Sequence, residues 1–182
     1  IGMYLGLEVV LDKEEPQKKL VIVRSVVPTR DMGFLPGGIE EKIDTYTAPY
    51  RGIAAELFDQ KNAYELLETQ GAIEFLSTSF IRGTTLDNAV ILVDEMQNLT
   101  FHELDSIITR VGRNSRIIFS GDYYQTDLNK DADKKGILEF LNIMEVMNNF
   151  TTIEFGWADI VRSDFVRDYI MTKDMVTRGE IQ

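Results

Sequence analysis

The chain has 182 residues, a length that fits one globular domain with a sizeable buried core. Its formal charge is −11, which argues against a broad basic surface for nucleic acid but leaves room for a local basic groove. No apolar run approaches the roughly 20 residues of a membrane span, and the absence of cysteine excludes disulfides and thiolate metal sites. We therefore expect one domain over residues 1–182, in a reducing, cytoplasmic compartment.

The first half of the chain alternates between helical and strand-like patterns. Residues 1–11 read as a helix with no N-cap before it, so we expect a further segment upstream of Ile1. Residues 20–23 form a short apolar run, which is typical of a strand buried on both faces. A helix is predicted from about residue 53 to residue 67, and a strand over residues 72–76.

The second half continues this alternation. Residues 89–93 are a fully apolar strand, and Thr100 with Glu103 forms a capping-box pattern at the start of the next helix. The remaining expected elements are a strand at 116–120, a helix at 136–147, a strand at 151–155 and a helix at 164–171. Alternating strands and helices predict an α/β fold, a three-layer sandwich with a mostly parallel sheet.

Two carboxylates follow the apolar strand at 89–93. Asp94 and Glu95 stand where the strand ends, and ligands of parallel sheets bind at the carboxyl ends of the strands. An apolar strand ending in Asp-Glu is the Walker B pattern, in which the Asp orders a hydrated Mg²⁺ and the Glu polarises a water toward the γ-phosphate. The alternative is a strand that ends in two solvated acids.

A second strand ends in polar residues of a related pattern. The strand at 116–120 is followed by Gly121-Asp122 and then by Gln125. This order is that of motif III in superfamily 1 helicases, where the Gln amide can bond both a γ-phosphate oxygen and the attacking water. The alternative is a Gly-Asp turn with an exposed glutamine, and the preceding Walker B pattern favours motif III.

Six segments extend this pattern over nearly the whole chain. They are FLPG at 34–37, IRGTTL at 81–86, DEMQNLT at 94–100, TRVG at 109–112, GDYYQTDL at 121–128 and DIVR at 159–162. In this order they resemble the PhoH-like family of P-loop ATPases. The resemblance implies a RecA-like P-loop NTPase core with helicase-like motifs, which binds and hydrolyses ATP with Mg²⁺.

The resemblance also implies roles for particular residues. Asp94 would bind Mg²⁺ through water, Glu95 would activate the attacking water, and Gln125 would sense the γ-phosphate. Gly121 and Asp122 would belong to the nucleotide-binding turn. The family's first strand and its Walker A loop, GxxxxGK[ST], are missing from these residues, and residues 1–11 look like the helix that follows that loop. Without the loop, we expect this chain to bind ATP poorly.

Arg162 is the candidate for an arginine that meets the γ-phosphate, from the same subunit or from a neighbour. The alternative is a surface arginine paired with Asp159 or Asp164, and Arg167 is the less favoured substitute. Family likeness implies coupling of hydrolysis to nucleic acid, RNA or another single strand. Arg24 and Arg82 are the residues that we would test first for this contact.

Other polar residues have simpler interpretations. His102, the only histidine, is expected to be a solvated imidazole. A cluster of three arginines could bind phosphate, but a solvated helix end is favoured; they are Arg110, Arg113 and Arg116. Tyr123 and Tyr124 could stack on a base or pack against the sheet, and the sequence leaves both open.

Two rival functions remain at this stage. One is a non-catalytic remnant or assembly module, which the missing P-loop favours and the Asp94-Glu95 pair disfavours. The other is a helicase-like translocase, although the chain has one ATPase core and such enzymes usually need two. We expect a homo-oligomer, such as a ring in which a neighbouring subunit supplies the arginine. We expect the source to be a bacterium or a bacteriophage.

Overall fold

The computed structural model describes residues 1–26, 39–122 and 131–179, and of residues 39–42 and 131–134 only the backbone. The chain divides into two compact units, Ile1–Asn142 and Ile143–Gln182, which are described separately below. Among the helices of the described ranges, none combines the length and the apolar character needed to cross a bilayer.

A four-stranded parallel sheet forms the centre of the first unit. Its strands lie in the order β2 (Ile73–Ser77), β1 (Lys19–Arg24), β3 (Ala89–Val93) and β4 (Arg116–Phe119). All three neighbouring pairs are parallel. The predicted α/β class is therefore confirmed, and the carboxyl ends of all four strands meet at one edge.

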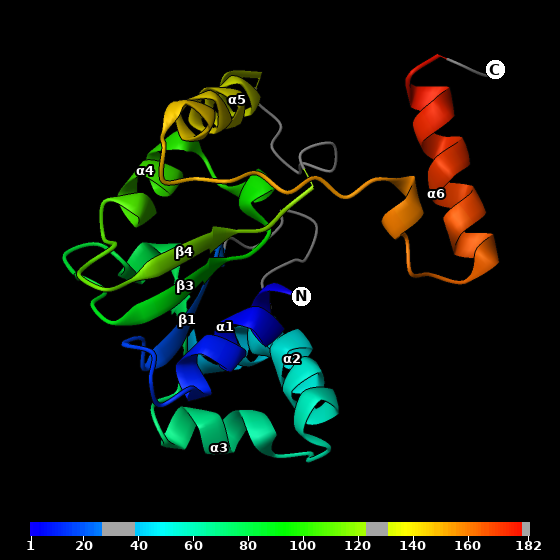
Figure 1. Ribbon diagram of the computed structural model, residues 1–182. Coiled ribbons are helices and arrows are strands. Elements are labelled where there is room, and N and C mark those ends of the chain that lie inside the picture. Colours follow the sequence, from blue (N-terminus) through cyan, green and yellow to red (C-terminus); the bar gives the residue numbers. More distant parts are fainter. Residues whose placement is uncertain (27–38, 123–130, 180–182) are drawn as a thin grey trace. The chain divides into compact units, whose positions relative to one another are not determined.

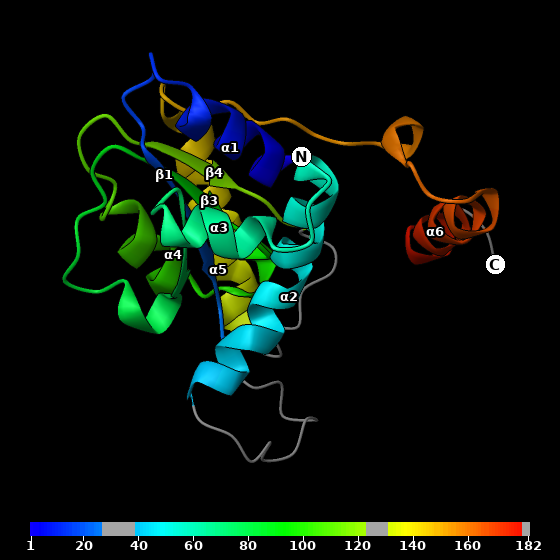
Figure 2. The ribbon, with the colours of Figure 1, turned by 90° about the horizontal axis from the view of Figure 1, so that it is seen from below.

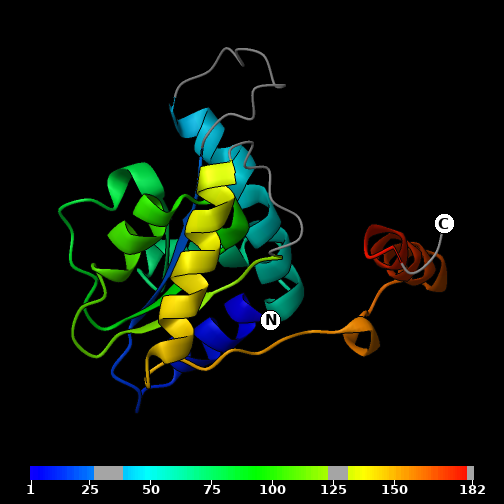
Figure 3. The same cartoon turned by 90° about the horizontal axis from the view of Figure 1, so that it is seen from above.

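Helices cover both faces of the sheet (Figure 1). Three lie on one face, in front of the sheet in Figure 2: α1 (Gly2–Leu11), α2 (Ile39–Phe58) and α3 (Ala63–Thr69). Two lie on the other face, in front of it in Figure 3: α4 (Phe101–Ile108) and α5 (Asp131–Val146). The result is the three-layer arrangement that the sequence predicts.

The two central strands are buried on both faces. Every residue of β3 is buried, and so are the four apolar residues of β1, from Leu20 to Val23. Burial of each such aliphatic side chain contributes about 1.5–3 kcal/mol. The prediction of strands covered on both sides is thus confirmed, and these strands form a rigid base for the residues that follow them.

Two glycines let α1 lie directly on the sheet. A Cβ atom on Gly2 would lie 2.8 Å from Leu92 Cδ1, and one on Gly6 would lie 2.7 Å from Leu20 Cδ1. A larger residue at either position would force the facing Leu side chain or the helix to move. Because Gly2 contacts the penultimate residue of β3, the N-terminus of α1 lies at the carboxyl edge of the sheet.

The capping box at the start of α4 is confirmed. Thr100 Oγ1 accepts from the Glu103 N–H at 3.3 Å, and the Glu103 carboxylate accepts from the Thr100 N–H at 2.9 Å. The single helix expected at residues 53–67 is wrong, because α2 ends at Phe58 and α3 begins at Ala63. Asp59 adopts a left-handed conformation with φ 49°, which ends α2.

The second unit contains η3 (Trp157–Asp159), one turn of 3₁₀ helix, and α6 (Asp164–Thr177). Trp157 Nε1 donates to Asp174 Oδ2 at 2.9 Å, which holds the turn against α6. The strand expected at residues 151–155 is wrong, since these residues have no regular structure and their side chains are exposed. A strand needs a partner for its backbone groups, and none of the described strands pairs with this segment.

Tyr64 on α3 offers a test of packing away from the strand ends. Its side chain is buried, and its hydroxyl has no hydrogen-bond partner within the described residues; burial raises the pKa of Tyr64 to about 12. Because a buried polar group without a partner costs about 1–3 kcal/mol, Tyr64→Phe is expected to raise the free energy of unfolding by about 1 kcal/mol. Urea denaturation measures it, and a loss of stability would contradict this account.

Candidate functional site

Asp94 extends the carboxyl end of β3 and is fixed from two sides. Its backbone N–H donates to the Val23 carbonyl of β1 at 2.9 Å, which continues the ladder by one bond. The Tyr50 hydroxyl, reaching from α2, donates to Asp94 Oδ2 at 2.5 Å. Asp94 is therefore held by its backbone in the sheet and by its side chain against a helix.

Tyr50 is itself buried and strongly perturbed. Burial raises the pKa of the Tyr50 phenol well above its usual range, and the hydrogen bond to Asp94 and the charge of that carboxylate raise it further. The nearby Arg24 side chain acts in the opposite direction. The phenol thus keeps its proton at neutral pH and remains a donor to Asp94.

Glu95 stands in a strained backbone conformation. Its φ of 54° and ψ of 42° lie in the left-handed region, which costs a non-glycine residue on the order of 1–2 kcal/mol. Its carboxylate accepts a hydrogen bond from Gln97 Nε2 at 2.6 Å. Such strain is common where a side chain must be presented for function, and here it directs the chain from β3 into η2 (Met96–Asn98).

Gln97 joins the ends of β3 and β4. Its side chain is buried, and its Oε1 accepts from the Asp122 N–H at 3.2 Å while its Nε2 donates to Glu95. In the same place the Met96 N–H donates to the Ser120 carbonyl at 3.0 Å. The structure thus brings Asp94, Glu95 and the Gly-Asp turn together at one edge.

Gly121 is required by this close approach. A Cβ atom there would collide with the Gln97 side-chain oxygen and lie 2.8 Å from Met96 Cγ. The sequence reading gave neither Gln97 nor Tyr50 a role. The position of Gln97, two residues after Glu95, could have indicated it, whereas nothing in the local sequence points from Tyr50 to Asp94.

Residues after β2 contact the start of α4. Thr78 Oγ1 donates to Glu103 Oε1 at 3.1 Å. Arg82 Nη2 lies 3.0 Å from His102 Nε2, a contact in which the guanidinium can only donate. His102 is exposed, as expected, but it also orients Arg82. Arg24 ends β1, next to β2 in the sheet, so both arginines follow neighbouring strands.

The other predicted residues lie elsewhere. Gln125, Tyr123 and Tyr124 fall outside the described residues. Arg162 is exposed in the second unit, and it forms no ion pair with any residue that the structure describes. Arg116 begins β4, at the opposite edge of the sheet, and its guanidinium pairs with Glu15 at 2.8 Å.

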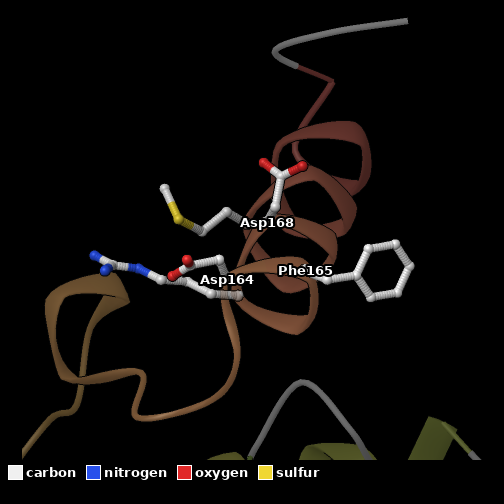
Figure 4. Close-up of a pocket in the computed structure, with 5 residues that line it drawn as sticks. Asp164, Phe165 and Asp168 are labelled. Carbon is white, nitrogen blue, oxygen red and sulfur yellow. The ribbon is translucent and has the colours of Figure 1, made fainter.

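A shallow depression lies on α6, in the second unit (Figure 4). Its lining comes from one helix only: Asp164, Phe165, Arg167, Asp168 and Met171. Phe165 points away from Asp164 in this view. A depression on one helix face encloses little of a ligand. We therefore favour the edge where β3 and β4 end as the candidate site.

The link through Gln97 can be tested by comparison with Gln17, a second buried glutamine. Gln97→Leu removes the local bond to Glu95 and the bond from the Asp122 N–H, which joins the end of β4 to the segment after β3. It is expected to lower the free energy of unfolding by about 1–3 kcal/mol. Gln17→Leu removes a bond to the Asn114 carbonyl, far from the site. We expect both variants to lose stability in urea, and only Gln97→Leu to impair the function proposed below for the full-length protein.

The parallel sheet, its helical layers and the acidic residues at the ends of its strands define an α/β protein of the P-loop NTPase type. The chain belongs to the PhoH-like protein family, whose model matches residues 1–173. It is 32% identical over 158 residues to a PhoH-like protein of Bacillus subtilis, covering 86% of this chain and 49% of that protein. It is 32% identical over 168 residues to a PhoH-like protein of Synechocystis (92% and 50%) and 33% identical over 147 residues to protein PhoH of Escherichia coli (80% and 41%). The chain spans about half the length of these relatives, or less.

Proposed function

We propose that the complete protein is an Mg²⁺-dependent ATPase whose hydrolysis is coupled to nucleic acid. Asp94 holds the hydrated metal, Glu95 accepts the proton of the attacking water, and Gln125 contacts the γ-phosphate. Gly121 and Asp122 form the turn beside the nucleotide, and Arg162 neutralises charge that develops in phosphoryl transfer.

One observation carries this proposal. The Gln97 side chain bonds both Glu95, which follows β3, and Asp122, which follows β4, and the Met96 N–H donates to the Ser120 carbonyl beside them. The N-terminus of α1 lies at the same edge, because Gly2 packs on Leu92. A helix N-terminus favours an anion such as phosphate. Carboxylates that could serve a metal and a water therefore lie at the same edge as a helix end that could bind phosphate.

The connections of the sheet support a position for the proposed Walker A strand. The chain passes from β1 over the α2 and α3 face to β2, and from β3 over the α4 face to β4 (Figure 1). These two crossovers run in opposite directions over opposite faces, so they have the same hand. α1 lies on the α2 and α3 face and leads into β1.

A strand that feeds α1 with that same hand must start on the β4 side of β1. β3 is already paired on both sides, and within the described residues β4 pairs only with β3. We therefore propose that a strand upstream of Ile1 pairs with the outer edge of β4. Its carboxyl end would then deliver the phosphate-binding loop between residues 120–122 and the start of α1.

The site suits Mg²⁺ better than a metal that needs an all-protein cage. Mg²⁺ keeps several waters and is usually bound through one or two carboxylates and the nucleotide phosphates. Among the described residues, no three His, Cys, Asp or Glu side chains gather in a metal-binding group. Asp94, held by Tyr50, fits a metal that takes most of its ligands from water and phosphate, and the ion would supply positive charge to the phosphates.

Nucleic-acid coupling is proposed through Arg24 and Arg82. Both follow adjacent strands at the edge where the nucleotide would bind, and His102 orients Arg82. RNA or another single strand is the proposed ligand, in the cytoplasm, with a homo-oligomeric ring as the proposed assembly. Because the whole chain has a formal charge of −11, we expect nucleic acid to bind only around these arginines and to bind more weakly as the salt concentration rises.

ATP hydrolysis by the full-length protein tests the proposal, with and without single-stranded RNA at low salt. We expect Mg²⁺-dependent turnover that RNA stimulates. No turnover with any divalent metal would favour the non-catalytic assembly module. Turnover without stimulation by RNA or single-stranded DNA would retain the ATPase and remove the coupling.

A further inference from the structure

The contact between Tyr50 and Asp94 extends the function proposed above, which names Tyr50 only as a residue that holds Asp94. Tyr50 lies in the middle of α2, and its hydroxyl spans the gap from that helix to the end of β3 with a bond of 2.5 Å. The ring is buried and packs beside Phe75 of β2, with the two ring centroids 6.1 Å apart. The phenol therefore has little freedom to leave Asp94.

We propose that Tyr50 is a positioning residue, which orients the Asp94 carboxylate for the divalent metal through its hydrogen bond to Oδ2. The inference rests on the proposed function, because it assigns Tyr50 to the metal site of that ATPase. Tyr50 does not touch the metal or the nucleotide in this account.

A carboxylate offers about four lone-pair directions. The Tyr50 bond uses one of them and restricts rotation of the carboxyl group, while the Val23 carbonyl fixes the Asp94 backbone. The remaining directions stay available to metal-bound water. Partners that orient a metal ligand typically change metal affinity by about 10–100-fold when they are removed.

The Arg24 side chain, at the end of β1, is near the same phenol. It lowers the pKa of Tyr50, whereas Asp94 raises it. Tyr50 thus lies close to both a carboxylate and a guanidinium.

Tyr64 supplies a matched control. It is also a buried tyrosine of the helices on this face, but its hydroxyl has no hydrogen-bond partner within the described part of the chain. Tyr50→Phe and Tyr64→Phe each remove one buried hydroxyl and keep the ring. Only Tyr50→Phe removes a bond to the proposed metal ligand.

The test is Mn²⁺ binding to the full-length protein in the presence of ADP, measured from the electron paramagnetic resonance signal of free Mn²⁺. Tyr50→Phe is expected to raise the dissociation constant about tenfold, with a melting temperature close to that of the parent. Tyr64→Phe should leave the constant unchanged. Equal or tighter Mn²⁺ binding by Tyr50→Phe would overturn the inference.

Asp94→Asn distinguishes failure of the proposed function from failure of the role inferred for Tyr50. If it leaves Mn²⁺ binding intact, the metal is not at Asp94, and the proposed function and the inference both fail. If it weakens binding while Tyr50→Phe does not, only the inference fails. In the Asp94→Asn background, Tyr50→Phe should have no further effect, and an additive effect would assign Tyr50 a general structural role.

Discussion

Replacement of Glu95 by glutamine in the full-length protein is expected to lower kcat for ATP hydrolysis by about 10²–10⁴-fold, the range for loss of a general base. The substitution keeps the shape of the side chain, and its amide oxygen can still accept the hydrogen bond from Gln97 Nε2. What it removes is the negative charge and the ability to take a proton from water. Nucleotide binding should therefore survive.

Single-turnover hydrolysis measures the loss, and binding of a fluorescent ATP analogue provides the control. The melting temperature should stay near that of the parent, since the left-handed backbone at Glu95 is equally strained with glutamine. Parental turnover by Glu95→Gln would exclude Glu95 as the base. Loss of both binding and folding would show a structural role instead.

Replacement of Arg162 by alanine is expected to lower kcat by about 10³–10⁵-fold, as for other arginines that stabilise charge in phosphoryl transfer. Arg162 is exposed just before α6, and within the described residues it has no ion-pair partner, Asp159 and Asp164 included. Its removal should therefore leave stability unchanged, which separates the effect from unfolding.

Arg167→Ala is the matched control, because Arg167 is also exposed and lies three residues inside α6. We expect it to retain parental kcat. Mixing Arg162→Ala with Glu95→Gln protein distinguishes the source of the arginine: recovered activity in the mixture indicates a residue supplied by a neighbouring subunit. Equal activity of Arg162→Ala and parent would remove Arg162 from the site.

The sheet was predictable because its signal is local. Residues 20–23 and 89–93 are uninterrupted apolar runs, and such runs in an α/β pattern become central strands. The Asp-Glu and Gly-Asp pairs follow their strands directly, so their common edge follows from parallel topology. The family motifs then ordered these pieces along the chain.

What the sequence did not reveal depends on contacts between distant residues. The bond from Tyr50 to Asp94 joins α2 to β3, and no periodicity encodes it. The end of α2 depends on the left-handed conformation of Asp59, which propensity does not specify. Residues 151–155 have the composition of a strand but pair with no described strand, since pairing is a property of the neighbours.

The position of β1 in the sheet also bears on how the protein folds. Both of its partners arrive late: Leu20 pairs with Ile73 and with Val90, roughly 50 and 70 residues further along the chain. Non-local parallel pairing of this kind slows folding, because loops must close before contacts form. During synthesis, the edge of β1 that pairs with β3 therefore stays uncovered until Ala89–Val93 has left the ribosome.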